Sequence, residues 1–166
     1  MKNSSGNSRQ AFAGLKRLAN ALKFDKRPSG SSKTFGRMLA EGVAQEIRDR
    51  TVGGQSEPSG QSFTPLTATT LAIKAKMGQP STISIATGEM MRMENVIGTL
   101  TVSSNEMSQQ EGVSGVAKEH TELFSTGGHG EYADRPYYEM GPGGEHVAHQ
   151  ITKKVLEDAV NEESRR

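Results

Sequence analysis

The chain has 166 residues, of which 33% are hydrophobic and 5% aromatic, and it contains neither Cys nor Trp. The missing cysteines exclude disulfides and thiolate zinc sites, and no apolar run approaches the ~20 residues that span a bilayer. The N-terminal segment has no continuous apolar stretch, so we expect no secretory signal and an intracellular protein, or one assembled inside a cell. The length suits one domain with a modest core.

Charge is distributed unevenly along the chain. The formal net charge is +1, yet residues 1–34 carry eight basic residues and one acidic residue, a balance of +7. Residues 35–166 carry 12 basic and 18 acidic residues, a balance of −6. A basic arm on an acidic body predicts contact with an anionic surface, either nucleic acid or an acidic face of a partner. A mobile, solubilising terminus is the alternative.

The N-terminal arm is predicted to contain one short helix. Residues 1–10 are polar and are expected to be disordered. From residue 11, apolar side chains recur at helical spacing opposite basic ones, which indicates an amphipathic helix. Its apolar stripe consists of Phe12, Leu15, Leu18, Ala19 and Leu22. This stripe could lie on a membrane, in a partner's groove or on its own domain. The run from Pro28 to Ser32 predicts a hinge.

Two further helices are expected before the middle of the chain. The first begins near Ser32 or Thr34, whose hydroxyls suit an N-cap, and the glycines of residues 51–54 are expected to end it. Its apolar positions recur every four residues, at Phe35, Leu39, Val43 and Ile47. After a polar loop, a short helix is predicted from the capping residue Thr67 to Met77.

Strands are expected in the second half, followed by a last helix. The segments 82–85 and 96–102 are rich in β-branched residues and predict strands, and 113–117 is a further candidate. The polar segment between Val102 and Val113 is expected to be irregular. A Gly- and Pro-rich loop contains Tyr132, Tyr137 and Tyr138, and a helix from Glu145 to Glu163 follows. We therefore predict an α+β fold, a small antiparallel β-sheet flanked by helices. Residues 1–34 are an extended basic helical arm, and residues 35–163 are the domain.

No chemical motif stands out. The chain has no Gly-x-Ser-x-Gly elbow, and the glycine run at 127–130 lacks the Lys and Ser or Thr of a phosphate loop. His146 and His149 share a helix face, but two imidazoles without a third ligand are more often an exposed pair than a metal site. His120 and His129 are expected in loops or contacts. The Met90, Met91 and Met93 cluster fits either an adaptable contact surface or core filling. We predict no catalytic residue, no cofactor and no metal.

One ordered series of residues is more specific than any single motif. It comprises Phe63, Pro65-Leu66, Thr70, Lys74, the apolar residues 83–85, Thr87-Gly88, His120, Phe124, Gly127-Gly128, Arg135-Pro136-Tyr137 and the C-terminal helix. In this order the chain resembles the phage virion-morphogenesis or tail-completion family, small neck proteins of tailed bacteriophages, over roughly residues 35–160. Met90 or Met91 stands where the family has Leu, and residues 1–34 have no counterpart.

The resemblance implies a structural protein and not an enzyme. It implies a homo-oligomeric ring, a hexamer or a dodecamer, at the head–tail junction of a virion assembled in the host cytoplasm. The ring would contact neighbouring neck, connector and tail proteins, with DNA passing through its lumen and no membrane involved. Tail completion, head–tail joining and tail termination stay open as roles. The residues expected at interfaces are Phe12, Leu15, Leu18, Leu22, Arg135, Pro136 and Tyr137. A nucleic-acid-binding protein that uses the basic arm is the alternative.

Overall fold

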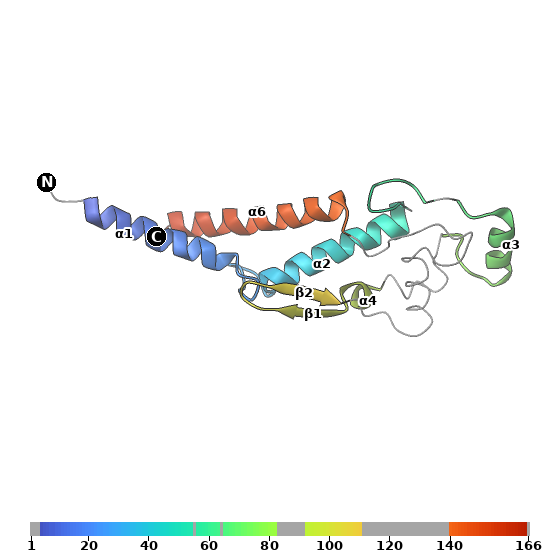
Figure 1. Cartoon of the computed structure of the whole chain (residues 1–166), viewed down its shortest axis with the longest axis horizontal. Helices are drawn as coiled ribbons and strands as arrows, with labels where there is room; N and C mark the ends of the chain where they lie inside the picture. The colour runs from blue at the N-terminus through green and yellow to red at the C-terminus, as the bar shows by residue number, and fades with distance from the viewer. Residues whose placement is uncertain (1–3, 55, 64, 83–91, 111–139, 166) are drawn as a thin grey trace.

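The computed structural model describes residues 4–54, 56–63, 65–82, 92–110 and 140–165, which form one elongated body (Figure 1). The elements are α1 (Ser4–Ala21), α2 (Phe35–Arg48), the π-helical turn η1 (Asp49–Gly54), α3 (Ala68–Lys76), α4 (Met93–Ile97), β1 (Thr99–Val102), β2 (Met107–Gln110) and α6 (Pro142–Ser164). The predicted combination of helices with a small antiparallel sheet is confirmed at this coarse level. Most of the described chain is helical, and the sheet described has two strands.

Helix α2 is the centre of the fold and starts where the sequence predicts. Thr34 caps it, because its side-chain oxygen accepts a hydrogen bond from the Arg37 N–H at 3.3 Å. The four-residue spacing of apolar positions turns them towards α6, α4 and β1, which all contact α2. The buried apolar side chains of α2 are Phe35, Leu39, Ala40, Ala44 and Ile47. The regular helix ends at Arg48, and the glycines expected to close it belong to η1.

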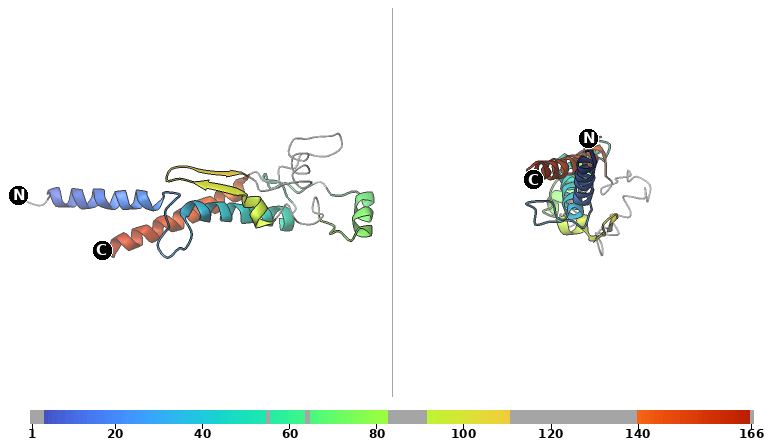
Figure 2. Two further views of the ribbon diagram at one scale, coloured as in Figure 1. Left: turned by 90° about the horizontal axis from the view of Figure 1, so that it is seen from below. Right: turned by 90° about the vertical axis from the view of Figure 1, so that its left-hand side faces the viewer.

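Helix α6 runs antiparallel to α2 and packs along it (Figures 1 and 2). It begins at Pro142, three residues before the predicted start, because proline suits the first position of a helix, where no N–H partner is needed. Val155 is 2% exposed and packs with Phe35 and Leu39, and Ile151 lies against the same cluster. The two long helices thus share one of the two small cores in the described chain.

The segment predicted as a strand over 96–102 divides into two elements. Residues 93–97 form the short helix α4, and only Thr99–Val102 is a strand. Val96 and Ile97 are buried against Ala44 and Ile47 of α2, so tertiary burial overrides their β propensity. Gly98 has a φ of 55°, a conformation that favours glycine, and it turns the chain from the helix into the strand.

The polar segment expected to be irregular contains a strand. Met107–Gln110 pairs antiparallel with β1, and Val102 lies opposite Met107. The turn between them is held by the Ser103 N–H, which donates to the Glu106 carbonyl at 2.8 Å. Strand β2 carries mainly polar side chains and gives no apolar alternation, so pairing with β1 is what defines it.

The N-terminal helix is longer than the sequence predicts. Residues 4–10, expected to be disordered, continue α1 to Ser4. Once a helix exists, each added residue contributes one more hydrogen bond, and this segment contains no proline to prevent it. Helix α1 extends away from the rest of the body at the end opposite α3 (Figure 2).

Several predictions fall outside the described residues. These are the strand residues 83–85, the candidate strand 113–117 and the tyrosine-containing loop. The short helix predicted after Thr67 is confirmed as α3, with the Thr67 side chain accepting from the Thr70 N–H at 3.2 Å. No helix in the described ranges combines the length and apolar character that a bilayer crossing requires.

Candidate functional site

The contact between α1 and α6 joins the basic arm to the acidic end of the chain. The Arg17 guanidinium donates two hydrogen bonds to the Glu163 carboxylate, through Nε at 2.6 Å and through Nη2. Gly14, one turn earlier on α1, also faces Glu163. The hydrogen bond that Arg17 donates to Glu163 raises the pKa of Arg17. Bidentate pairing of this kind fixes the orientation of the two helices.

The packing between α1 and α6 is open. A cavity of about 200 Å³ lies between α1, α6 and the loop after α1, and is lined in part by Arg17, Ala21, Val155 and Ala159. Leu15, which belongs to the predicted apolar stripe, is 62% exposed. An apolar side chain left in water at this level contributes little to folding. The Arg17–Glu163 pair is one of the contacts that join α1 to the body, and Leu22, directly after α1, packs against the core.

The segment between α1 and α2 is fastened to the body at both of its ends. Phe24 stacks on Phe35 with ring centroids 5.7 Å apart, and the Gly36 N–H donates to the Phe24 carbonyl at 2.9 Å. The Phe24 N–H donates to the Ser104 carbonyl in the hairpin turn at 3.2 Å. The run from Pro28 to Ser32 lies inside this closed loop. Leu22, just before Phe24, also packs against the core, so the chain is attached to the body directly after α1.

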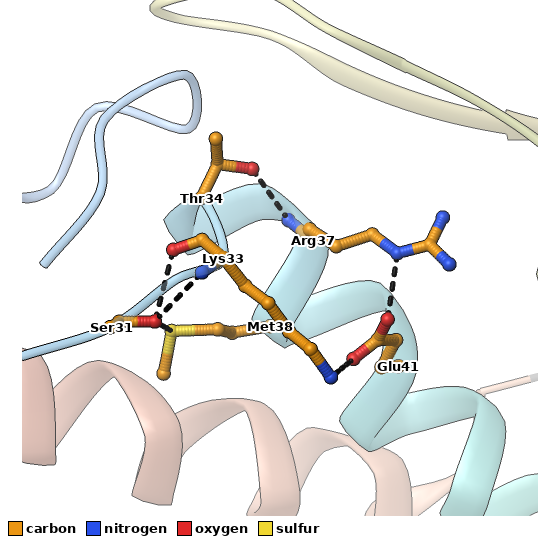
Figure 3. Close-up of polar contacts among 6 residues, drawn as sticks. All are labelled: Ser31, Lys33, Thr34, Arg37, Met38 and Glu41. Carbon is orange, nitrogen blue, oxygen red and sulfur yellow. Dashed lines mark hydrogen bonds and ion pairs between the residues drawn. The ribbon is translucent and has the colours of Figure 1, made fainter.

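A charged cluster stands at the start of α2, beside this loop (Figure 3). The Glu41 carboxylate accepts hydrogen bonds from Lys33 Nζ and Arg37 Nε, at 2.5 Å and 2.7 Å. The hydrogen bond from Lys33, and after it the one from Arg37, lowers the pKa of Glu41 against an opposing effect of burial. Ser31 Oγ accepts from the Lys33 N–H and contacts Met38 Sδ. The cluster lines a cavity of about 630 Å³ between the loop, α2 and α6.

Acid is expected to remove the stabilisation that Glu41 provides. Its pKa is lower in the folded chain than in the unfolded chain, so the contribution is present above about pH 4.3 and is lost as the pH falls through the folded value. Glu41→Gln should therefore flatten the decline in unfolding free energy between about pH 5 and pH 3, measured by urea denaturation. Glu157→Gln, at an exposed pair 3.8 Å from Lys153, is the matched control. A wild-type slope in Glu41→Gln would contradict the prediction.

Helix α3 lies at the far end of the molecule (Figure 1). Leu71, Ile73 and Met77 are 39%, 54% and 65% exposed. Lys74 is buried instead, and its Nζ donates to the Thr82 carbonyl at 2.5 Å. Burial lowers the pKa of Lys74. This lysine is part of the ordered residue series, and its contact holds the chain after α3 against the helix.

A largely buried ion pair between α2 and η1 lies against the start of α6. Glu46 and Arg50 approach to 3.5 Å, with side chains 16% and 7% exposed. The Glu46 carboxylate lies against Gly143 and Gly144 in the first turn of α6. A carboxylate at a helix N-terminus is favoured by the free N–H groups and the helix dipole. Glu46 therefore contacts both Arg50 and the first turn of α6.

The structure describes some of the interface residues predicted from sequence, and the others lie outside the described ranges. On α1, Leu15 is exposed, Leu18 is half-buried, and the side chain of Phe12 is outside the described part. Leu22 packs against the core formed by Phe35, Leu39 and Val155. The predicted Arg135, Pro136 and Tyr137 lie outside the described residues. His146 and His149 are both exposed on α6.

Other candidate contact residues have no sequence signal of their own. Arg17 and Glu163 meet across 146 positions, and only the opposite charges of the two chain halves hint at their pairing. Val160 is 46% exposed although it shares the apolar pattern of the last helix, because α6 extends beyond the end of α2 (Figure 1). Within the described ranges no group of three or more His, Cys, Asp or Glu side chains could hold a metal ion.

Comparison with known proteins yields no relative. No protein-family model, no curated protein and no solved structure matches the chain.

Proposed function

We propose that the chain is a structural protein of a tailed bacteriophage, acting as a ring in the neck at the head–tail junction. Residues 35–163 would be the tail-completion-like domain and residues 1–34 the arm. The proposal is supported by the residue order from Phe63 to Thr87-Gly88 and on to Arg135-Pro136-Tyr137. It places the protein in the virion after assembly in the host cytoplasm, with neck, connector and tail proteins as neighbours.

One observation supports the ring: α1 and the last turns of α6 lie at one end of the elongated molecule and α3 at the other (Figure 1), and all three helices have exposed apolar side chains. Leu15 and Val160 are exposed on α1 and the last turns of α6, and Ile73 and Met77 are exposed on α3. Two different apolar surfaces suit a heterologous, head-to-tail contact, which closes into a ring when the rotation between copies is right. A symmetric dimer would need only one such surface.

The charge distribution agrees with a channel for DNA. Residues 35–166 carry a balance of −6, so a lumen lined by this part of the chain would repel phosphates and let DNA pass without being retained. The proposed role contains no bond-making step, cofactor or metal. In the proposed role the protein acts only through contacts with other protein chains.

Electron microscopy of the purified protein, alone and mixed with neck and tail components, tests this function. The expected result is a ring of six or twelve copies with a central channel, a stoichiometry that the family resemblance suggests. Light scattering of the same samples would give the mass of the oligomer. A chain that stays monomeric in every mixture, or that turns over a substrate, would overturn the proposal.

The alternative, binding of nucleic acid through the basic arm, uses the same helix. Helix α1 contains no acidic residue and carries Lys16 and Arg17 among its described side chains. Arg17 is already occupied by Glu163, which removes one cation from phosphate contact. A salt titration separates the two functions, since a DNA-binding arm loses affinity steeply as salt rises, with a slope set by its phosphate contacts.

A further inference from the structure

We propose that the last turn of α6 shields cations of the N-terminal arm, so that DNA passing through the ring is not held by them. The inference rests on the proposed function and explains how one ring can combine a basic arm with a channel for DNA. Residues 1–34 carry a balance of +7, and cations in such excess bind a phosphate backbone without regard to sequence. The shield lies where the end of α6 runs beside α1 (Figure 1).

The first step concerns the Arg17 guanidinium. It donates to both oxygens of the Glu163 carboxylate, from Nε at 2.6 Å and from Nη2. Arginine binds a phosphate group with the same two-pronged geometry. The Arg17 side chain is 47% exposed, so a phosphate could reach it from solvent. Because the same N–H groups cannot hold a carboxylate and a phosphate together, Glu163 competes directly with DNA for Arg17.

The second step concerns two further cations of the arm, which meet α6 at the same place. Lys26 and Arg27 line, together with Arg17, the cavity of about 200 Å³ between α1, α6 and the loop after α1. Glu162 lines this cavity from the side of α6 and accepts a hydrogen bond from Ser29 Oγ at 2.7 Å. A carboxylate fixed beside three cations lowers the positive potential that they present to solvent. Phosphates are therefore attracted less strongly to this end of the chain.

The third step concerns the position of the two carboxylates on their own helix. The last turn of α6 contains Glu162 and Glu163 and no basic residue. Carboxylates are unfavourable there, because the free C=O groups at a helix C-terminus carry partial negative charge. Local helix energetics therefore do not explain these two residues. The arm opposite them does, since each carboxylate accepts a hydrogen bond from a residue of the arm.

The loop that carries Lys26 and Arg27 is fixed on the body beside α6. The Phe35 N–H donates to the Lys26 carbonyl at 2.7 Å, and the Phe24 ring stacks on Phe35. The shielding carboxylates and the cations thus belong to one folded unit. A carboxylate in the same unit competes at a high effective concentration, whereas a phosphate has to arrive from solution. Passing DNA is at a disadvantage at these cations.

Neutralising the two carboxylates tests the shield. The variant Glu162→Gln with Glu163→Gln should bind a fluorescein-labelled duplex DNA of mixed sequence more tightly than the wild type, measured by fluorescence anisotropy over a salt series. Its slope of log K against log salt should be steeper by about 0.9 for each cation freed for phosphate contact. Between about 50 and 200 mM salt, this adds about a threefold loss of affinity per freed cation.

The matched control removes two charges elsewhere on the same helix. Glu145 lies in the first turn of α6, and Glu157 pairs with Lys153 at 3.8 Å. Glu145→Gln with Glu157→Gln gives the same net charge as the test variant, and its salt slope should equal that of the wild type. A control slope as steep as that of the test variant would overturn the shield, because overall charge would then account for the gain.

A triple variant separates the shield from a change in folding. Adding Arg17→Gln to the Glu162→Gln and Glu163→Gln variant should lower the slope again by about 0.9, since the shielded cation is gone. Circular dichroism of every variant checks the helix content. If the wild type and the test variant bind DNA with the same affinity and slope, the shield is wrong, and a ring seen by electron microscopy still stands. A chain that shows the gain but forms no ring would keep the shield and overturn the ring.

Discussion

Phe35→Ala is expected to lower the free energy of unfolding by about 3–5 kcal/mol, the range for truncating a buried aromatic side chain. Phe35 is 3% exposed at the start of α2 and packs with Leu39 and Val155. Its ring also stacks on Phe24, nearly parallel at 9°. The substitution therefore removes core contacts and one fastening of the loop that leads from α1. Urea denaturation followed by circular dichroism measures the change.

Leu71→Ala provides the matched control for this prediction. Leu71 is 39% exposed on α3, so its truncation should change the unfolding free energy by no more than about 0.5 kcal/mol. Limited proteolysis adds a local readout, because loss of the Phe24–Phe35 stack should speed cleavage in residues 24–34. A Phe35→Ala chain as stable as the wild type would show that the loop and the core are not coupled in this way.

Gly42→Leu is expected to destabilise the fold by about 1–3 kcal/mol through overpacking between α2 and α6. A Cβ built on Gly42 lies 2.5 Å from Ile151 Cδ1 and 3.1 Å from Val147 Cγ1. Even one methyl group would displace the Ile151 side chain, and a leucine would push the helices apart. Thermal unfolding should show a lower midpoint than the wild type.

The control for Gly42 is a glycine with room around it. A Cβ on Gly53 meets nothing within 4 Å, so Gly53→Leu should leave stability nearly unchanged. Gly42→Ala tests a smaller side chain at the same position. Alanine favours the helix by about 1 kcal/mol over glycine, and this gain offsets part of the steric clash with Ile151. A Gly42→Leu midpoint at or above that of the wild type would mean that α6 does not pack closely on this face.

Local sequence patterns predicted the long helices correctly. The spacing of Phe35, Leu39 and Ile47 and the hydroxyl of Thr34 indicate α2 without any knowledge of its neighbours, because helical periodicity and capping act within a few residues. The same reasoning located α3 from Thr67 and most of α6. It did not predict that residues 4–10 continue α1, since a polar segment carries no periodic signal.

The tertiary structure decided what lies between the helices and where surfaces meet. Val96 and Ile97 have β propensity but form a helix because they are buried on α2, and residues 107–110 become a strand only through pairing with β1. The Arg17–Glu163 contact joins residues 146 positions apart, a distance over which sequence gives only the sign of the charges. Burial and ion pairing depend on which segments lie next to one another in space, and the whole fold determines those neighbours.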